Sequence, residues 1–268
     1  MNITIIIPVH EYNDDVSRYL PKSIESINNQ IGIDIKPTII FVAPKEIYES
    51  INTLLGDTEY QFIANPNGSD YQSQVNYAVE HVKTDYFTIL EFDDEFAQTY
   101  FKNANTYINS YPDVDIFLSM MIEVNERNEG IKLTNDSVWS QQFVGENGEM
   151  GYLNISSLKQ YTDFKLSGAI IKKSEFINIG MFKLNIKLSF GYELILRALN
   201  NACKIFSIPK IGYKHLATRE KSLFSRYLKE MSVPERKFWF ETATKEANFN
   251  SDRIIDISKL EKPLDVKK

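Results

Sequence analysis

Four carboxylates fall within five residues directly after a short apolar run. They belong to Glu91, Asp93, Asp94 and Glu95, and the apolar run starts at Tyr86. Like charges this close raise one another's pKa unless a cation compensates them. Carboxylate oxygens at the end of a strand suit Mg²⁺ or Mn²⁺ bridging a diphosphate. The competing interpretation is a solvated helix start, because Asp and Glu are also favoured in the first turn of a helix.

The elements around this acidic turn alternate between apolar runs and stretches with helical spacing. Such alternation predicts an α/β fold: a mostly parallel sheet flanked by helices, with a ligand crevice beyond the carboxyl ends of the strands. His10 and Glu11 follow the first apolar run, so we expect them at the same rim as the acidic turn. The expected strands cover residues 3–9, 38–42, 60–63 and 86–92, and the expected helices cover residues 14–29, 45–55 and 71–82.

The second half of the chain is less regular. The expected strands there cover residues 115–124, 167–171 and 204–208, and the expected helix covers residues 192–201. Residues 134–151 form a polar loop that contains Trp139, and loops of this length are often functional. We expect one domain over residues 1–220 and a C-terminal helical extension over residues 221–268, packed on the core or on a partner subunit.

Composition limits the classes of partner and compartment. The 36 acidic and 30 basic residues give a formal charge of −6, which disfavours binding of nucleic acid over the whole surface. The single cysteine, Cys203, excludes an intramolecular disulfide and favours a reducing compartment. No secretory signal is evident, and no apolar stretch reaches membrane-spanning length. We therefore expect a cytoplasmic protein without a transmembrane segment.

Several motifs in the first half resemble, in order along the chain, those of the GT-A glycosyltransferases of family 2. Residues 5–11, which include Pro8, His10 and Glu11, look like the first strand of that family and its nucleotide-contacting turn. Asn76 ends a triplet that is usually Ala-Arg-Asn in the family. The acidic turn stands where the family has its Asp-x-Asp-Asp sequence, a form of the DXD motif.

The resemblance covers roughly residues 3–222. Ser167 and Gly168 begin a stretch that looks like the strand preceding the family's catalytic acid, and residues 192–197 match the helix that bears this acid. His215 matches a late histidine of the family, although a lone histidine near a strand end is often an ordinary polar residue. Each motif is loose, and their common order makes the resemblance specific.

The resemblance implies a GT-A, Rossmann-like fold and an enzyme that moves a sugar from a nucleoside-diphosphate sugar to an acceptor hydroxyl, with inversion. It also implies Mn²⁺ or Mg²⁺, which would neutralise the charge building on the departing diphosphate. The implied metal ligands are Asp93, Asp94 and His215. The implied donor contacts are Pro8, His10, Glu11, Ala43, Asn76, Glu91, Phe92 and Asp93. The suggested acceptor contacts are Trp139, Ser167 and Gly168.

Two positions depart from the family pattern. The family has Glu-Asp, with the Asp as general base, where this chain has Phe190 and Gly191. Glu193 is the nearest carboxylate and our candidate base, but it can instead pair with Arg197 one helical turn later. The family also ends its second strand with an Asp that helps read the nucleotide base, where this chain has Ala43.

These departures keep other hypotheses open. One is a catalytically inactive nucleotide-sugar-binding protein of the same fold. Another is a nucleotidyltransferase on a similar sheet, although no Gly-rich phosphate loop of the usual kind follows the first strand. The sequence leaves open the donor sugar, the stereochemical outcome and the acceptor, for which glycan, lipid-linked and protein molecules all fit. It also leaves open a homo-oligomer formed through the C-terminal helices.

Overall fold

The computed structural model describes residues 2–33, 36–135, 151–154, 164–217, 219–235 and 237. The strands are β1 (Ile3–Pro8), β2 (Thr38–Ala43), β3 (Gln61–Ala64), β4 (Tyr86–Ile89), β5 (Glu95–Phe96), β6 (Ile116–Val124), β7 (Gly130–Thr134), β8 (Ile170–Lys172) and β9 (Ile205–Leu216). The helices are α1 (Asp14–Asn28), the 3-10 helix η1 (Lys45–Ile47), α2 (Tyr48–Leu55), α3 (Tyr71–His81), α4 (Tyr100–Ser110), α6 (Lys173–Asn178), α7 (Phe190–Asn200) and α8 (Leu223–Glu230).

One nine-stranded sheet organises the described chain, in the order β3-β2-β1-β4-β8-β6-β9-β5 with β7 paired to β6. The first four strands are mutually parallel, as the alternating pattern predicted. Beyond them β8 runs antiparallel to both β4 and β6, while β6 and β9 are parallel. The α/β fold flanked by helices is thus confirmed, with a sheet that is parallel in its first half and mixed overall.

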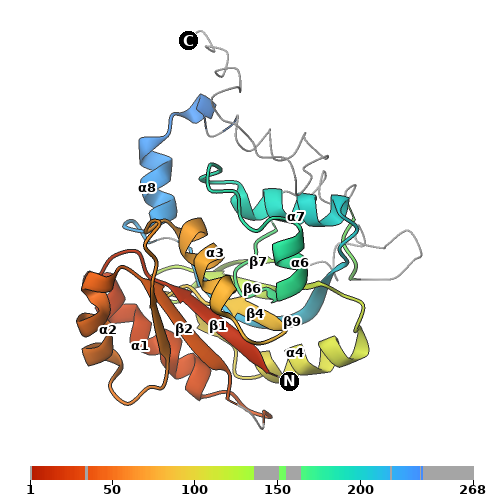
Figure 1. Ribbon diagram of the computed structural model, residues 1–268, viewed down its shortest axis with the longest axis horizontal. Helices are drawn as coiled ribbons and strands as arrows, with labels where there is room; N and C mark the ends of the chain where they lie inside the picture. The colour runs from red at the N-terminus through yellow and green to blue at the C-terminus, as the bar shows by residue number, and fades with distance from the viewer. Residues whose placement is uncertain are drawn as a thin grey trace.

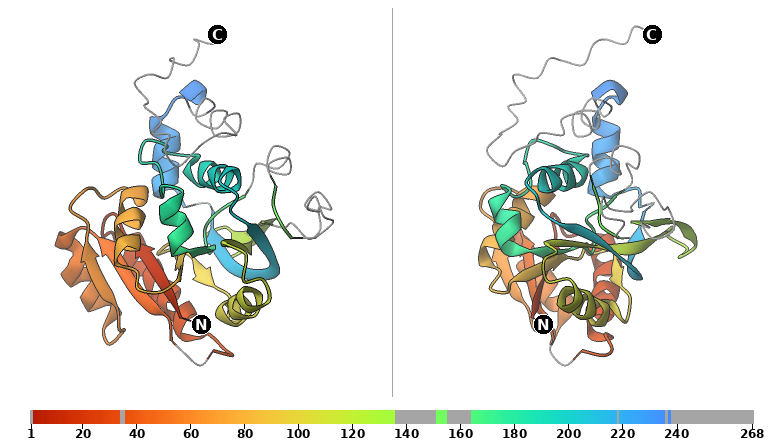
Figure 2. Two further views of the ribbon diagram at one scale, coloured as in Figure 1. Left: turned by 45° about the vertical axis from the view of Figure 1, so that its right-hand side comes forward. Right: turned by 90° about the vertical axis from the view of Figure 1, so that its right-hand side faces the viewer.

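Helices cover both faces of the sheet (Figures 1 and 2). Strand side chains alternate between the faces, so Ile5 and Phe41 belong to one core cluster while Ile6 and Ile40 belong to the other. Helices α1, α2 and α4 pack on the first cluster, and α3, α6 and α7 pack on the second. This double cover explains why β1 and β2 read as continuous apolar runs.

Local signals in the sequence fix the first helix at the rim of the sheet. The side chain of Asn13 caps α1 by accepting hydrogen bonds from the backbone N–H groups of Asp15 and Val16, at 3.0 and 3.2 Å. The helix then buries an apolar stripe that includes Val16, Leu20 and Ile24. Because β1 ends directly before this cap, His10 and Glu11 lie in the turn at the carboxyl end of the strand.

The last strand is longer than the sequence predicted. It continues past Ile208 through Pro209 to Leu216, with register shifts against β6 at Ser119 and Met120. His215 therefore lies within a strand that reaches the acidic turn, and Glu95 of β5 pairs with β9 beside it. The helix α4 was not predicted from the sequence.

The chain beyond β9 returns to the first half of the fold. Helix α8 belongs to the predicted C-terminal extension, of which residues 221–235 and 237 are described. Within the described ranges, no helix combines the length and apolarity needed to cross a membrane. The division into a domain at residues 1–220 and an extension at residues 221–268 stays a prediction.

Candidate metal and nucleotide site

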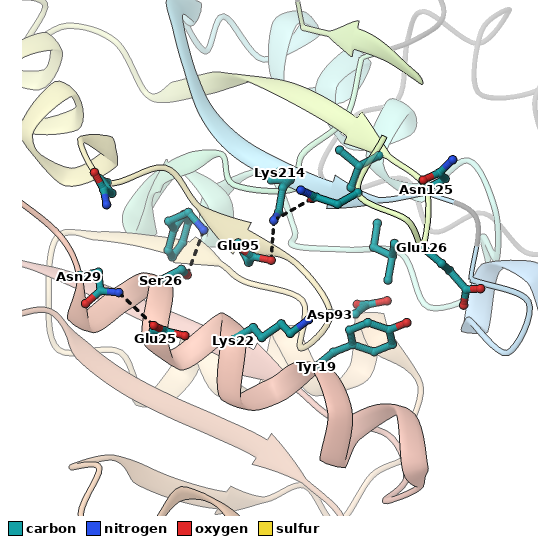
Figure 3. Close-up of a pocket in the computed structure, with 15 residues that line it drawn as sticks. Tyr19, Lys22, Glu25, Ser26, Asn29, Asp93, Glu95, Asn125, Glu126 and Lys214 are labelled. Carbon is teal, nitrogen blue, oxygen red and sulfur yellow. Dashed lines mark hydrogen bonds and ion pairs between the residues drawn. The ribbon is translucent and has the colours of Figure 1, made fainter. Parts of the chain in front are cut away.

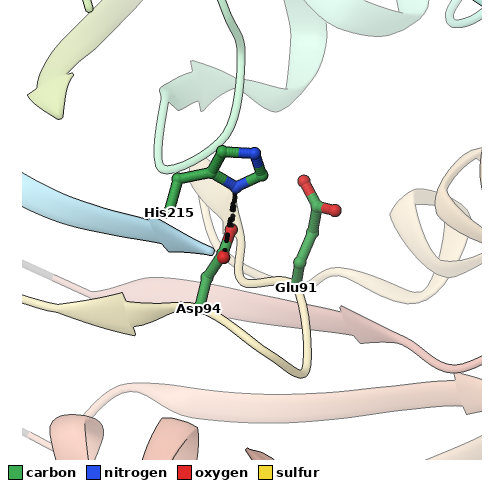
Figure 4. A group of neighbouring side chains, drawn as sticks. All are labelled: Glu91, Asp94 and His215. Atoms are coloured by element: carbon green, nitrogen blue, oxygen red, sulfur yellow. Dashed lines mark hydrogen bonds and ion pairs between the residues drawn. The ribbon is translucent and has the colours of Figure 1, made fainter. Parts of the chain in front are cut away.

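Glu91, Asp94 and His215 meet at the end of β4 (Figure 4). Each offers one ligand atom, and these atoms lie within 4.8 Å of one another. The pairing of Glu95 with Lys214 in the β5–β9 ladder brings the neighbouring residues Asp94 and His215 together. Mn²⁺ binds both carboxylates and imidazoles, whereas Mg²⁺ binds mainly the carboxylates. These residues therefore fit a divalent cation.

Asp94 is held rigidly in this cluster. The residue is 1% exposed, and its two carboxylate oxygens lie 3.1 and 2.9 Å from Nδ1 of His215. The backbone N–H of Leu216 donates a further hydrogen bond to Asp94 at 2.9 Å. Burial by itself would lower the pKa of His215, but the charge and hydrogen bond of Asp94 raise this pKa to about 9. A bound cation would neutralise the charge of Asp94, which the protonated imidazole of His215 otherwise neutralises.

Glu91 holds a proton to unusually high pH for a carboxyl group. Burial and the negative charge of Asp94 raise its pKa to about 7. The hydroxyl of Ser167 donates to Glu91 at 2.9 Å, so Ser167, predicted as an acceptor contact, borders the cluster. Gly168 follows with φ +66°, and a Cβ there would lie 2.3 Å from the ring of Tyr213, so only glycine fits this turn.

Asp93, predicted as a metal ligand, has a different partner. Nε of Arg219 lies 2.7 Å from its Oδ2, and Nη1 of the same guanidinium lies 3.0 Å from Asp15. The guanidinium also covers the ring of Phe92, 4.8 Å from the centroid. Burial and the charge of Asp94 nevertheless raise the pKa of Asp93 to about 6. Glu91 thus joins Asp94 and His215 in the cluster, and the metal and donor roles of Asp93 stay predictions.

The other predicted donor residues lie near the ends of β1 and β2. Pro8 and Ala43 are buried last residues of these strands, and Glu11 is exposed and paired with Arg226 at 2.9 Å. His10 is mostly buried, which lowers its pKa. Its Nε2 lies 3.4 Å from the carboxylate of Glu11.

Two predicted contacts lie elsewhere or outside the described chain. The side-chain amide of Asn76 is bonded to the backbone of Phe182, donating at 2.9 Å and accepting at 3.0 Å, so it ties α3 to the turn after α6. Trp139 lies outside the described residues. The donor role of Asn76 and the acceptor role of Trp139 stay predictions.

Glu193, the candidate base, forms the ion pair that the sequence offered as its alternative. Both its side chain and that of Arg197 are 0% exposed, and the guanidinium contacts both carboxylate oxygens, at 2.6 and 2.9 Å. Arg197 also donates to the backbone oxygens of Ile179 and Met181. The pair therefore fastens α7 to the turn after α6, and the contacts favour a structural role for Glu193.

Sequence reasoning missed two residues at the site. Arg219 follows His215 by only four positions, but no local pattern indicates that it returns to Asp93 across 126 residues. Tyr71, on α3, faces the acids: burial raises its pKa well above the usual value, and the charges of Glu91 and Asp94 add to this shift. In the sequence, Tyr71 carried no signal beyond its helical spacing.

The charge balance of the site predicts a pH dependence of stability. Because the pKa of His215 rises on folding, its pairing stabilises the fold fully below about pH 6.5 and is lost as the pH rises through about 9. Glu91 and Asp93 act in the same direction, since folding raises their pKa values to about 7 and about 6. In chelator, the melting temperature should fall steadily between about pH 5 and pH 9. His215→Gln should flatten the upper part, and a melting temperature that rises across this window would contradict the assignment.

The Glu193–Arg197 pair predicts non-additive effects on stability. Glu193→Leu or Arg197→Met alone should lower the free energy of unfolding by about 3–5 kcal/mol, because each leaves an unpaired buried charge. The double variant should lose less than the sum of the two, as urea unfolding can measure. Purely additive losses, or single losses under about 1 kcal/mol, would be inconsistent with a buried ion pair.

Comparisons with known proteins agree with this geometry. No curated protein sequence matches the chain. Among solved structures, the fold resembles S. aureus TarS 1–349 in complex with UDP-GlcNAc, with a TM-score of 0.68 and 14% identity over 94% of this chain and 68% of that one. The same protein in complex with UDP gives a TM-score of 0.60 and 13% identity over 92% and 81%. The longer TarS structure gives a TM-score of 0.61 and 14% identity over 82% and 37%.

The sequence itself gives the family. The profile of "Glycosyl transferase family 2" matches residues 4–160, which include β1, the helix α1 and the acidic turn with two of the three cluster residues. The structural likeness, at such low identity, shows the GT-A fold independently of that match. The chain belongs to glycosyl transferase family 2.

Proposed function

We propose that this protein is a metal-dependent glycosyltransferase that moves a sugar from a nucleoside-diphosphate sugar to an acceptor hydroxyl. The observation that carries the proposal is the cluster of Glu91, Asp94 and His215 where β4 ends. Ligands of open α/β sheets bind beyond the carboxyl ends of parallel strands. Three protein ligands leave coordination positions for diphosphate oxygens. The bound UDP-GlcNAc of the similar TarS structure supports a nucleotide sugar as the ligand class.

The strand ends offer groups for the donor. Nε2 of His10 is buried and lies 3.4 Å from the carboxylate of Glu11, and burial lowers the pKa of His10, so the imidazole is neutral at pH 7. A neutral imidazole can donate or accept a hydrogen bond from a ribose or phosphate oxygen. Asp93 is covered by Arg219, so a donor contact through Asp93 requires this ion pair to open.

The reaction would be a direct displacement. The acceptor oxygen attacks the anomeric carbon, the bond to the diphosphate oxygen breaks, and the configuration inverts. Mn²⁺ or Mg²⁺ at the cluster would neutralise the charge on the leaving diphosphate. The acceptor proton needs a base, and Glu193 can serve only if Arg197 releases its carboxylate. If Glu193 is the general base, Glu193→Gln should lower the rate of sugar transfer by about a hundredfold without lowering stability.

The acceptor side of the site begins at Ser167 and Gly168, which border Glu91. We keep glycan, lipid-linked and protein acceptors as the candidate classes, because the described residues do not distinguish them. The cytoplasmic location and a homo-oligomer through the C-terminal helices stay predictions. Phe190, at the position of the missing acid, starts α7 and packs on Tyr71 with ring centroids 5.2 Å apart.

The direct test is consumption of donor by the purified protein. A panel of nucleoside-diphosphate sugars is incubated with Mn²⁺, Mg²⁺ or chelator, and the released nucleoside diphosphate is measured. One donor should be hydrolysed slowly with metal and not with chelator. Asp94→Asn should reduce this rate by about a hundredfold or more, because it removes the negative charge of a metal ligand.

Glu95→Gln is the matched control, since Glu95 lies next to Asp94 but pairs with Lys214. It should change the rate by no more than about twofold. Circular dichroism of Asp94→Asn verifies that the variant folds, and His215→Gln tests the same site through a less buried residue. Full hydrolysis in chelator would contradict metal dependence. Metal-dependent donor binding without any turnover, in the presence of candidate acceptors, would instead identify an inactive binder.

A further inference from the structure

A pocket lies beside the acidic turn, between α1 and the strands β5 and β9 (Figure 3). Its volume is about 510 Å³, within the range of about 300–1,000 Å³ typical of ligand sites. One wall is α1, and the other is formed by β5, β9 and the turn between β6 and β7. Lys214 and Leu216 of β9 line the pocket, whereas His215 between them belongs to the cluster. Strand alternation therefore directs Lys214 and Leu216 away from His215, and Asp93 of the acidic turn also lines the pocket.

Two lysines and four carboxylates line the pocket, and one of the carboxylates, Asp93, is neutralised by Arg219 at 2.7 Å. Glu95 is paired with Lys214 at 2.6 Å. Lys22, Glu25 and Glu126 also line the pocket, and none of them forms an ion pair within the described ranges. The unpaired carboxylates repel phosphate groups, and the lysines oppose a small cation. The lining therefore suits a neutral ligand that both donates and accepts hydrogen bonds.

One buried hydroxyl in this pocket needs a partner. Tyr19 is 8% exposed, lines the pocket and lies beside Asp93 (Figure 3). Its hydroxyl is buried and has no hydrogen-bond partner among the described residues. An unsatisfied buried hydroxyl costs free energy, which a ligand hydroxyl would recover. The pocket also contains buried apolar side chains, Phe96 and Leu216, against which the C–H groups of a ligand can pack.

We propose that this pocket binds a carbohydrate residue at a site separate from sugar transfer. Carbohydrates combine hydroxyls that donate and accept hydrogen bonds with apolar C–H faces. The carboxylates of Glu25 and Glu126 accept from such hydroxyls, and the ammonium of Lys22 donates to them. The hydroxyl of Tyr19 gains its missing partner in the same complex. The inference stands on the pocket alone and does not require donor turnover.

The test is binding of the full-length protein to a printed glycan array, with neutral, amino-sugar and acidic oligosaccharides. Titration calorimetry follows with any neutral oligosaccharide that is retained. Lys22→Trp places a large ring over the exposed mouth of the pocket and should weaken binding by at least about tenfold. Tyr19→Phe keeps the ring but removes the unpartnered hydroxyl, and should weaken binding by about three- to tenfold.

Asn28→Trp is the matched control, because Asn28 is exposed on the same helix but does not line the pocket. It should bind like the native protein, and UDP binding with Mn²⁺ should be equal in all these variants. The proposal is overturned if no oligosaccharide is retained, or if Lys22→Trp binds as tightly as Asn28→Trp. It is also overturned if UDP displaces the oligosaccharide, since binding would then be at the transfer site.

Discussion

The contact between Asp94, His215 and the backbone of Leu216 is the constraint on which the site depends. It joins the turn after β4 to a strand more than a hundred residues later, and it is supported by the short β5–β9 ladder. The hydroxyl of Ser23 in α1 also holds the acidic turn, 2.7 and 2.6 Å from the backbone oxygens of Phe92 and Asp94. With these contacts, Glu91 and His215 face the same small volume, and the fold has a fixed place for a cation.

This arrangement places mutually repelling, buried carboxylates at the rim of the sheet, which is electrostatically unfavourable. Burial, together with the negative charge of Asp94, raises the pKa of Glu91 to about 7 and that of Asp93 to about 6. Arg219 and His215 offset part of the repulsion from outside the turn. Functional sites commonly retain such unfavourable charge because a ligand relieves it. Each cation therefore pairs with one acid of the turn: Arg219 with Asp93, and His215 with Asp94.

Local signals in the sequence predicted much of the fold. Helical spacing over residues 14–29 indicated α1, and the unbroken apolar runs of β1 and β2 indicated a sheet covered on both faces. The length of β9 could not be predicted, because Pro209 within the run argues against a continuous strand and the bulge against β6 accommodates it. The sequence identified the acidic turn, but the choice of Glu91 over Asp93 depends on Arg219, which approaches from far along the chain.

The central claim, that Glu91, Asp94 and His215 form a divalent-cation site for a nucleoside diphosphate, is tested most directly by electron paramagnetic resonance of added Mn²⁺. The free-ion signal reports unbound Mn²⁺ in the presence and absence of UDP. The account predicts one bound Mn²⁺ per chain, tighter with UDP, and about 10- to 100-fold weaker in His215→Gln. A free-ion signal that the protein leaves unchanged, with or without UDP, would contradict it.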